Sequence, residues 1–169
     1  MQYVAQAGYA VVTTSSPKHE DFVSQLGSAM VVDHTQEHDA LVKALTVEGP
    51  YKLVVDSISL PQTVAVNAAV LAAQGGGDLF TLLPAFGPEA LPEGVTRRFE
   101  SWAVILREGK YSELSEWMYK VYLPQGLARG KIVPLPIEKV PGGLRGVNDA
   151  LSRLQKGVSG LKLVTDPWE

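Results

Sequence analysis

The sequence predicts an α/β protein built around a parallel sheet. In the first half of the 169-residue chain, short apolar and β-branched runs alternate with helix-like stretches, which is the pattern of strands joined by crossover helices. The runs are apolar throughout, as is typical of strands that are buried on both faces of a parallel sheet. We therefore expect strand–helix units whose strands all run in one direction.

Short apolar runs mark the expected strands of the first half: Tyr9–Thr14, Met30–Asp33, Leu53–Asp56 and Leu79–Leu83. Helices are expected between them, at residues 16–26, 39–45 and 60–74. Ser16 is expected to cap the first helix, with Pro17 at its first helical position. A glycine follows each of these stretches, as is common where a helix ends.

The second half of the chain is less regular, and its expected elements are shorter. Residues 84–94 are rich in proline and glycine and predict a loop. The remaining expectations are a strand at 97–106, a helix at 111–122, an extended segment at 131–140, a helix at 146–156 and a last strand at 161–164.

Composition and charge exclude several classes of protein. The chain has no cysteine, which excludes disulfides, zinc–thiolate sites, iron–sulfur clusters and cysteine nucleophiles. The net charge is -3 and no long basic run occurs, which argues against nucleic acid or an anionic membrane as partner. No apolar run is long enough to span a membrane, and the N-terminus lacks the basic region of a signal peptide. We therefore expect a soluble, cytoplasmic protein.

The strongest candidate site follows the first strand, at Ser15-Ser16-Pro17-Lys18-His19. Ligands of parallel sheets bind beyond the carboxyl ends of the strands, and two hydroxyls with a lysine at a helix N-terminus favour an anion. In a dinucleotide-binding fold, a cation here without an acid favours the 2′-phosphate of NADPH. An ordinary capped helix with a solvated lysine explains the same residues, and both readings stay open.

His34 and His38 are the only closely spaced histidines. On one helix they would share a face as metal ligands, but His34 follows a strand, so we favour two surface histidines and expect no metal site. Asp56, at another strand end, is expected to be structural. No G-x-S-x-G nucleophile motif and no phosphate-binding loop motif occur in the chain.

Several stretches, taken in order, resemble a known family of oxidoreductases. Residues 2–9, 11–14, 26–28 and 31–33 are similar to the cofactor domain of medium-chain dehydrogenase/reductases. Supporting stretches are 16–19, 97–99, 131–136 and 157–164. Together they cover nearly the whole chain. They most resemble the zinc-independent enoyl and quinone reductase branch and, within it, the ToxD-like trans-enoyl reductases that partner fungal polyketide synthases.

The resemblance implies a Rossmann-like, doubly wound parallel sheet that binds NADP(H). That sheet would occupy residues 1–130, and residues 131–169 would return to the family's catalytic domain. No G-x-G-x-x-G occurs, so the resemblance also implies that the first strand and its Gly-rich turn are missing and that the chain is truncated. In the family's strand order, Tyr9–Thr14 and Leu53–Asp56 then lose their shared neighbour. Either they pair directly, or a gap exposes unpaired backbone groups.

The resemblance further implies roles for individual residues in holding the adenosine half of the cofactor. The 2′-phosphate is expected at Ser16, Pro17, Lys18 and His19. The adenine is expected near His34, where the family often has a tyrosine.

Other residues are expected around the nicotinamide and the substrate. Leu82 and Leu83 would lie by the nicotinamide, and Val158 and Ser159 would close over the cofactor. The residues expected to approach the substrate are Trp102, Ala103 and Val104. The sequence assigns no catalytic residue.

The activity that the resemblance implies is NADPH-dependent reduction of a C=C bond. Its substrate would be a small or carrier-bound enoyl compound, with a polyketide synthase as a candidate partner. Reduction of a quinone or an alkenal differs only in the acceptor and stays open. The alternative class is a truncated, catalytically inactive remnant or an interaction module, so the sequence leaves open whether this chain alone is an enzyme.

Overall fold

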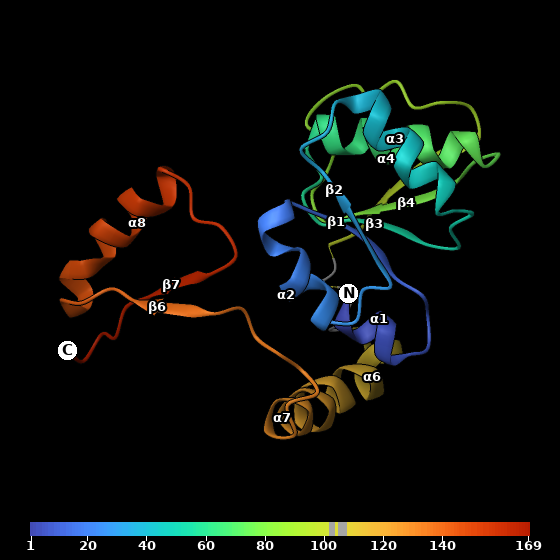
Figure 1. The fold of residues 1–169 in the computed structure, drawn as a ribbon. Helices are drawn as coiled ribbons and strands as arrows, with labels where there is room; N and C mark the ends of the chain where they lie inside the picture. Colours follow the sequence, from blue (N-terminus) through green and yellow to red (C-terminus); the bar gives the residue numbers. More distant parts are fainter. Residues whose placement is uncertain (102–103, 105–107) are drawn as a thin grey trace. The chain divides into compact units, whose positions relative to one another are not determined.

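Every strand pair in the structure is parallel. The structure is a computed structural model, and it describes residues 1–101, 104 and 108–169. The chain divides into two units, Met1–Val121 and Tyr122–Glu169, and each is described by itself (Figure 1).

The described strands of the first unit form two separate sheets. One sheet has the order β1-β2 and the other has the order β3-β4-β5. The strands are β1 (Val12–Ser15), β2 (Met30–Asp33), β3 (Val54–Asp56), β4 (Gly77–Thr81) and β5 (Val95–Phe99). Among the described residues, no strand pairing joins β1 to β3. The predicted α/β class is thus confirmed, and the two described sheets are not joined by backbone pairing between β1 and β3.

Helices precede, connect and follow these strands. They are α1 (Gln2–Gln6), the 3₁₀ helix η1 (Pro17–His19), α2 (Glu20–Gln25), α3 (His38–Val47), α4 (Pro61–Ala73), the 3₁₀ helix η2 (Gly109–Tyr111) and α6 (Ser112–Trp117). A π-helical turn, Met118–Tyr122, follows α6. Figure 1 shows α3 and α4 together on one side of the strands and α1 and α2 on the other.

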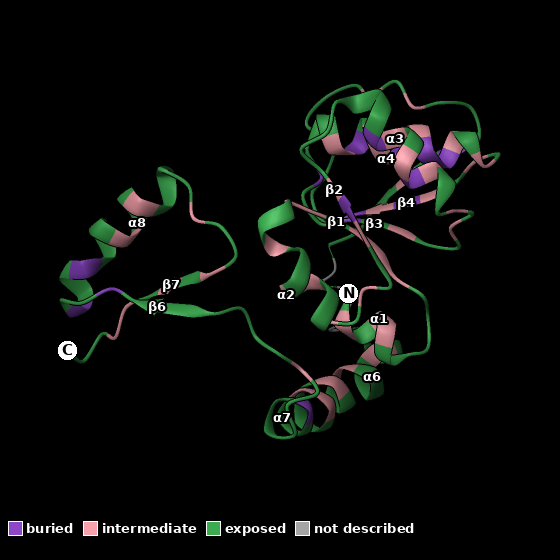
Figure 2. Ribbon diagram, viewed as in Figure 1, coloured by how far each residue is buried: buried purple, intermediate pink, exposed green. Residues whose placement is uncertain are grey.

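The core of the first unit consists of two hydrophobic clusters, and α4 contributes to both. Val64, Ala68 and Leu71 of α4 pack with Leu79 of β4 and Val95 of β5. A second cluster contains Val70 of α4 with three buried side chains of β2 and α3: Val32, Leu41 and Leu45. A helix that is apolar on all sides is buried on more than one side, and Figure 2 shows buried residues concentrated on α3, α4 and the adjoining strands.

A glycine turn fixes the entry from α4 into β4. Gly76 has a φ of 109°, in the region that favours glycine. A Cβ at this position would collide with the carbonyl oxygen of Gly94, just before β5. The turn therefore brings the beginnings of β4 and β5 together, where Gly77 N–H donates to Gly94 C=O (2.9 Å).

Some element bounds differ from the sequence-based expectation. β4 begins at Gly77 and ends at Thr81, so Leu82 and Leu83 lie beyond the strand rather than in it. Gly77 was expected to help end the helix at residues 60–74, but it is the first residue of β4. The tight turn before β4 needs only Gly75 and Gly76. The stretch expected as a helix from Ser16 divides into η1 and α2.

The second unit contains a small parallel sheet and its crossover helix. Its elements are α7 (Leu123–Ala128), β6 (Ile137–Lys139), the 3₁₀ helix η4 (Gly143–Gly146), α8 (Val147–Gln155) and β7 (Lys162–Val164). Val140 is 1% exposed, and its N–H donates to the carbonyl oxygen of Val164 (2.8 Å). In the described part of the chain, no helix is long and apolar enough to span a membrane.

The interruption between β1 and β3 predicts an alternating pattern of amide protection. Consecutive residues of a strand direct their backbone groups to opposite sides. Ser15 C=O accepts from His34 N–H beyond β2, and Asp56 C=O accepts from Leu82 N–H beyond β4. The backbone groups of Thr14 and Val55 are therefore directed away from the paired strands.

We expect the Thr14 and Val55 amides to exchange with solvent faster than those of their neighbours Ser15 and Asp56. The physical reason is that unpaired amides do not need an opening event before they exchange. Native-state hydrogen exchange followed by NMR measures this, with each neighbour serving as the matched control. Equal protection within both pairs of neighbours would show that β1 and β3 are paired.

Tyr51 joins the end of α3 to the end of α4. Its hydroxyl donates to Leu45 C=O (2.6 Å), its backbone N–H donates to the Gln74 side chain (2.8 Å), and the Gln74 amide donates back to Tyr51 C=O (2.9 Å). Burial, with a smaller contribution from the charge of Glu48, raises the pKa of the Tyr51 phenol above its usual value. The neutral phenol is thus the form that the fold stabilises.

Replacing Tyr51 with phenylalanine should lower the free energy of unfolding by about 1 kcal/mol at neutral pH, because one hydrogen bond is lost. In the native protein, the contribution of the raised pKa is fully present below about pH 10 and is lost as pH rises through the folded-state pKa. Urea unfolding from neutral to alkaline pH should show this loss in the native protein and not in Tyr51→Phe. Tyr9→Phe, at a residue that is 59% exposed, is the control. An identical alkaline decline in Tyr51→Phe would contradict the assignment.

Candidate functional site

The carboxyl ends of β1 and β2 bring the predicted adenosine residues to one edge of their sheet. His34 follows β2, and its N–H donates to the carbonyl oxygen of Ser15, the last residue of β1 (3.1 Å). Ser16, Pro17, Lys18 and His19 follow Ser15 directly. The residues expected to hold the cofactor phosphate and the one expected near the adenine therefore lie side by side.

The groups at this edge leave a positive charge available to a ligand. Lys18 is exposed, and it has no ion-pair partner among the residues that the structure describes. Ser16 stands at the N-cap position of η1 with Pro17 at the first position, as expected, but its side chain makes no capping hydrogen bond. The expected N-cap position of Ser16 and the first helical position of Pro17 are thus confirmed, and the short 3₁₀ turn is closed by the backbone bond from His19 N–H to Ser16 C=O (3.0 Å).

Asp33, the last residue of β2, is an acid near this edge. Its carboxylate accepts hydrogen bonds from the turn that follows β2. The backbone N–H and the hydroxyl of Thr35 both donate to Asp33 Oδ1 (2.8 and 2.7 Å). These bonds, the backbone one first, hold the pKa of Asp33 below its usual value. Asp33 therefore stays ionised at neutral pH with one oxygen already engaged.

His34 and His38 do not share a helix. His34 lies in the turn after β2, whereas His38 is the first residue of α3 and its Nδ1 contacts Asp39 Oδ1 at 3.0 Å. Among the described residues, no group of three or more His, Asp or Glu side chains is arranged to hold a metal ion.

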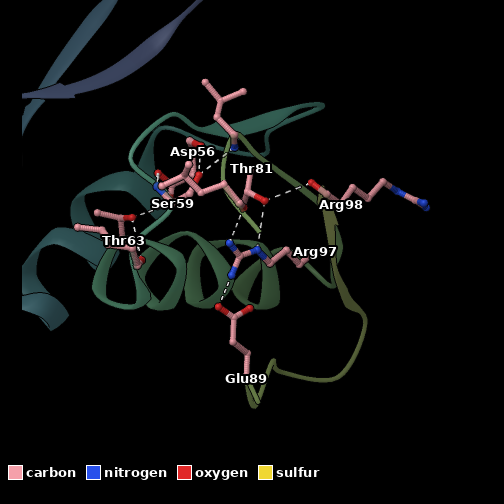
Figure 3. A network of polar contacts seen from close by, with 10 residues as sticks. Asp56, Ser59, Thr63, Thr81, Glu89, Arg97 and Arg98 are labelled. Carbon is pink, nitrogen blue, oxygen red and sulfur yellow. Dashed lines mark hydrogen bonds and ion pairs between the residues drawn. The ribbon is translucent and has the colours of Figure 1, made fainter. Parts of the chain in front are cut away.

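The carboxyl end of β3 is fixed by a buried aspartate turn (Figure 3). Asp56 is 4% exposed, and its Oδ1 accepts from the N–H groups of Ile58 and Ser59 (2.9 and 2.7 Å). Its Oδ2 accepts from the hydroxyl of Thr63 in the first turn of α4 (2.6 Å). Both oxygens of the Asp56 carboxylate thus accept hydrogen bonds that hold the turn between β3 and α4. This agrees with the structural role expected for Asp56 from the sequence.

Ser59 extends the same network to β4. It is fully buried and has a φ of 60°, a left-handed conformation that costs free energy outside glycine. Its hydroxyl donates to Asp56 C=O (2.7 Å) and accepts from Leu82 N–H (2.9 Å). The strained turn therefore ties the end of β3 to the residue that follows β4.

Leu82 and Leu83 occupy the position from which the expected nicotinamide contacts would be made. Both follow β4, and their side chains are 48% and 41% exposed. Ile58, in the turn after β3, is 55% exposed. The carboxyl ends of β3 and β4 thus present apolar side chains to solvent, which suits a ligand with an apolar or aromatic part.

Arg97 is a site residue that sequence reasoning did not single out. On β5, its guanidinium contacts Thr81, Leu83 and Glu89 (Figure 3). One signal was present: two arginines stand side by side in a strand of the predicted sheet, so alternation requires one of them to point inward. Ser59 and Thr63 also had a signal, since an aspartate three residues before a serine at a helix start is typical of a polar turn.

The remaining predicted residues lie elsewhere. Val158 and Ser159 are in the second unit, in the loop between α8 and β7. Val104 is 57% exposed, and its N–H donates to Ser101 C=O (2.7 Å). Trp102 and Ala103 lie outside the described residues. The expected roles of these residues stay predictions.

The residues present fit one end of a dinucleotide cofactor. Among the described residues, the Ser16 hydroxyl makes no capping bond and the Lys18 ammonium has no ion-pair partner, so both suit a phosphate on a ribose. His34, whose backbone is bonded to Ser15, adds an exposed aromatic ring. The Gly-rich motif that would cradle a pyrophosphate does not occur in the sequence. These groups can therefore bind and orient one end of a cofactor.

Relatives of this chain are fungal oxidoreductases. No protein-family model matches the sequence. Dehydrogenase azaJ of Aspergillus niger is 34% identical over 170 residues, covering 97% of this chain and 48% of that protein. Trans-enoyl reductase himH of Aspergillus japonicus is 31% identical over 168 residues, covering 98% of this chain and 47% of that protein. The chain thus spans about half the length of the curated relatives it matches.

Solved structures show the same fold. A putative zinc-dependent alcohol dehydrogenase from Rhizobium etli superposes with a TM-score of 0.68 at 18% identity, covering 94% of this chain and 47% of that one. The JamJ enoyl reductase in its apo form superposes with a TM-score of 0.62 at 13% identity, covering 96% of this chain and 50% of that one.

The chain shares its fold with these alcohol dehydrogenase and enoyl reductase structures over about half of their length. By sequence, it is a homologue of fungal dehydrogenases and trans-enoyl reductases. The resemblance stated from the sequence is confirmed.

The Asp56 turn predicts graded losses of stability. Asp56→Ala leaves two backbone donors and one hydroxyl without their acceptor, so the free energy of unfolding should fall by about 3 kcal/mol. Thr63→Val removes one of these bonds and should cost about 1 kcal/mol. Chemical denaturation measures both, with Glu93→Ala, at an exposed loop carboxylate, as a control that changes stability by about 0.5 kcal/mol or less. A loss in Asp56→Ala no larger than in that control would contradict the role given to this carboxylate.

Proposed function

We propose that this chain forms the NADPH-binding part of an enoyl reductase. The observation that carries the proposal is the meeting of two strand ends: Ser16 and Lys18 after β1 lie beside His34 after β2, joined through the Ser15–His34 backbone bond. The names of the relatives, among them trans-enoyl reductases himH and poxP, support an enoyl acceptor over a quinone or an alkenal.

In this proposal, the residues of the chain bind and orient the cofactor. The Lys18 ammonium and the Ser16 hydroxyl hold the 2′-phosphate, and His34 lies against the adenine. The apolar side chains of Leu82 and Leu83 flank the nicotinamide and exclude water. When bound, NADPH supplies the hydride for reduction of the activated C=C bond.

The substrate is proposed to be an α,β-unsaturated acyl compound, either free or carried as a thioester by a polyketide synthase. Residues 131–169 are proposed to return to the family's catalytic domain. Within them, Val158 and Ser159 are proposed to close over the cofactor, and residues 102–104 are proposed to approach the substrate. The absence of a Gly-rich motif from the sequence favours one alternative, an inactive remnant, which the binding experiment below separates from the proposal.

The test is a fluorescence titration of the purified chain with NADPH, with NADH as the comparison. Saturable binding that prefers NADPH is expected. Absence of binding to folded protein would reject the proposal in favour of a remnant that keeps the fold without the cofactor. Turnover of an enoyl thioester with NADPH would then be assayed on a chain that binds.

Lys18→Ala should reduce the preference for NADPH over NADH by about 1.5–3 kcal/mol, because a charge-assisted hydrogen bond to the phosphate is lost. Affinity for NADH should stay unchanged. Lys43→Ala, an exposed lysine of α3, removes the same charge at a distance from the strand ends and should leave both affinities as they are. An unchanged preference in Lys18→Ala would reject the role of Lys18.

A further inference from the structure

Arg97 is a half-buried residue of β5 with a largely buried side chain, and the next residue of the strand is exposed. The Arg97 side chain is 7% exposed, whereas that of Arg98 is 52% exposed and pairs with Asp78 (2.6 Å) on the neighbouring strand. Burying a guanidinium costs free energy that an ion pair alone does not reliably recover. A buried arginine at this point therefore calls for an explanation beyond stability.

The guanidinium contacts three residues at the end of β4 and in the chain that follows it (Figure 3). Its Nε donates to the Thr81 hydroxyl (3.1 Å), its Nη2 donates to the Leu83 carbonyl oxygen (2.9 Å), and its Nη1 pairs with Glu89 in the following loop. Arginine presents these donors in a fixed planar fork, which a lysine does not reproduce. Arg97 thus fixes the carbonyl group of Leu83, on the C-terminal side of the Leu82–Leu83 peptide.

The N–H group of Leu82, on the N-terminal side of the same peptide, is fixed by residues at the end of β3 and in the turn that follows it. Leu82 N–H donates to the Ser59 hydroxyl (2.9 Å) and to Asp56 C=O (3.3 Å). The peptide group between Leu82 and Leu83 is consequently fixed on both sides. Among the described residues, neither Leu82 C=O nor Leu83 N–H has a hydrogen-bond partner.

We propose that Arg97 is a positioning residue that, together with Ser59, fixes the Leu82–Leu83 peptide for contact with the nicotinamide half of the cofactor. The proposal rests on the function proposed above. It assigns to Arg97 no contact with the cofactor itself. Binding to a segment that is already rigid avoids the entropy of ordering it, so loosening the segment weakens affinity.

The test compares two ligands that differ in the nicotinamide half. NADPH and adenosine 2′,5′-bisphosphate share the adenosine 2′-phosphate, and only NADPH reaches Leu82 and Leu83. Arg97→Lys keeps the charge and loses the fork. It should weaken NADPH binding about tenfold, the equivalent of one to two lost hydrogen bonds, while affinity for the bisphosphate changes by less than about twofold. Arg98→Lys, one residue along the same strand, should change neither affinity.

A second variant keeps the proposal falsifiable if Arg97→Lys does not fold. Ser59→Gly removes the hydroxyl that holds Leu82 and accepts the φ of 60° without strain, so it should produce the same selective loss of NADPH affinity. Thermal unfolding of each variant reports whether the fold is kept.

The outcomes separate this proposal from the proposed function. A native chain that binds neither ligand overturns the function and the role of Arg97 with it. A native chain that binds NADPH, with folded Arg97→Lys and Ser59→Gly variants that bind it equally well, overturns the role of Arg97 alone. An equal loss of both ligands in the variants also overturns it, because that result indicates a general structural role.

Discussion

Burial of α4 between two hydrophobic clusters is the packing on which the rest of the first unit depends. Among the described elements, α4 is the one that contributes buried side chains to both clusters, through Val70 to the first sheet and through Ala68 and Leu71 to the second. No backbone pairing joins the described sheets. Side-chain packing on α3 and α4 therefore holds the two sheets together, as hydrogen bonds to a shared strand do in a continuous sheet.

The polar contacts at the carboxyl ends follow from the same helix. α4 begins where the Asp56 turn ends, and Thr63 in its first turn donates back to that carboxylate. Ser59 passes the constraint to Leu82, and Arg97 meets it from the other side. A hydrogen-bonded network that begins at the first turn of the buried helix α4 thus fixes the position of the chain after β4. The geometry of the polar site therefore depends on the packing of the apolar core.

Periodicity and turn signals in the sequence were enough to predict the fold class and the order of elements, because buried parallel strands and glycine-ended helices leave strong local patterns. The strands Met30–Asp33 and the helix α4 lie within a residue or so of their expected bounds. The end of β4 was misplaced by two residues, because Leu82 and Leu83 are as apolar as the strand they follow. Only the pairing with β3 and β5 decides where that strand stops.

The candidate site could be predicted where it depends on sequence order and not where it depends on pairing. Ser16, Lys18 and His34 follow strands that are adjacent in the sheet, so their proximity follows from topology. The inward direction of Arg97 depends on the register of β5 against β4, and the contact between Ser59 and Leu82 joins residues 23 positions apart. Neither leaves a local pattern that fixes its partner.

The interruption between β1 and β3 has a consequence for the thermodynamics of unfolding. In the described part of the chain, the packing of α3 and α4 and the Tyr51 hydrogen bonds couple the two sheets, and backbone pairing does not, so each sheet can open as a cooperative unit of its own. A ligand that contacts the ends of both sheets stabilises the state in which both are folded. Such a ligand would join the unfolding transitions of the two sheets into a single transition. The steepness of the thermal unfolding curve would then report the bound fraction as directly as the midpoint temperature does.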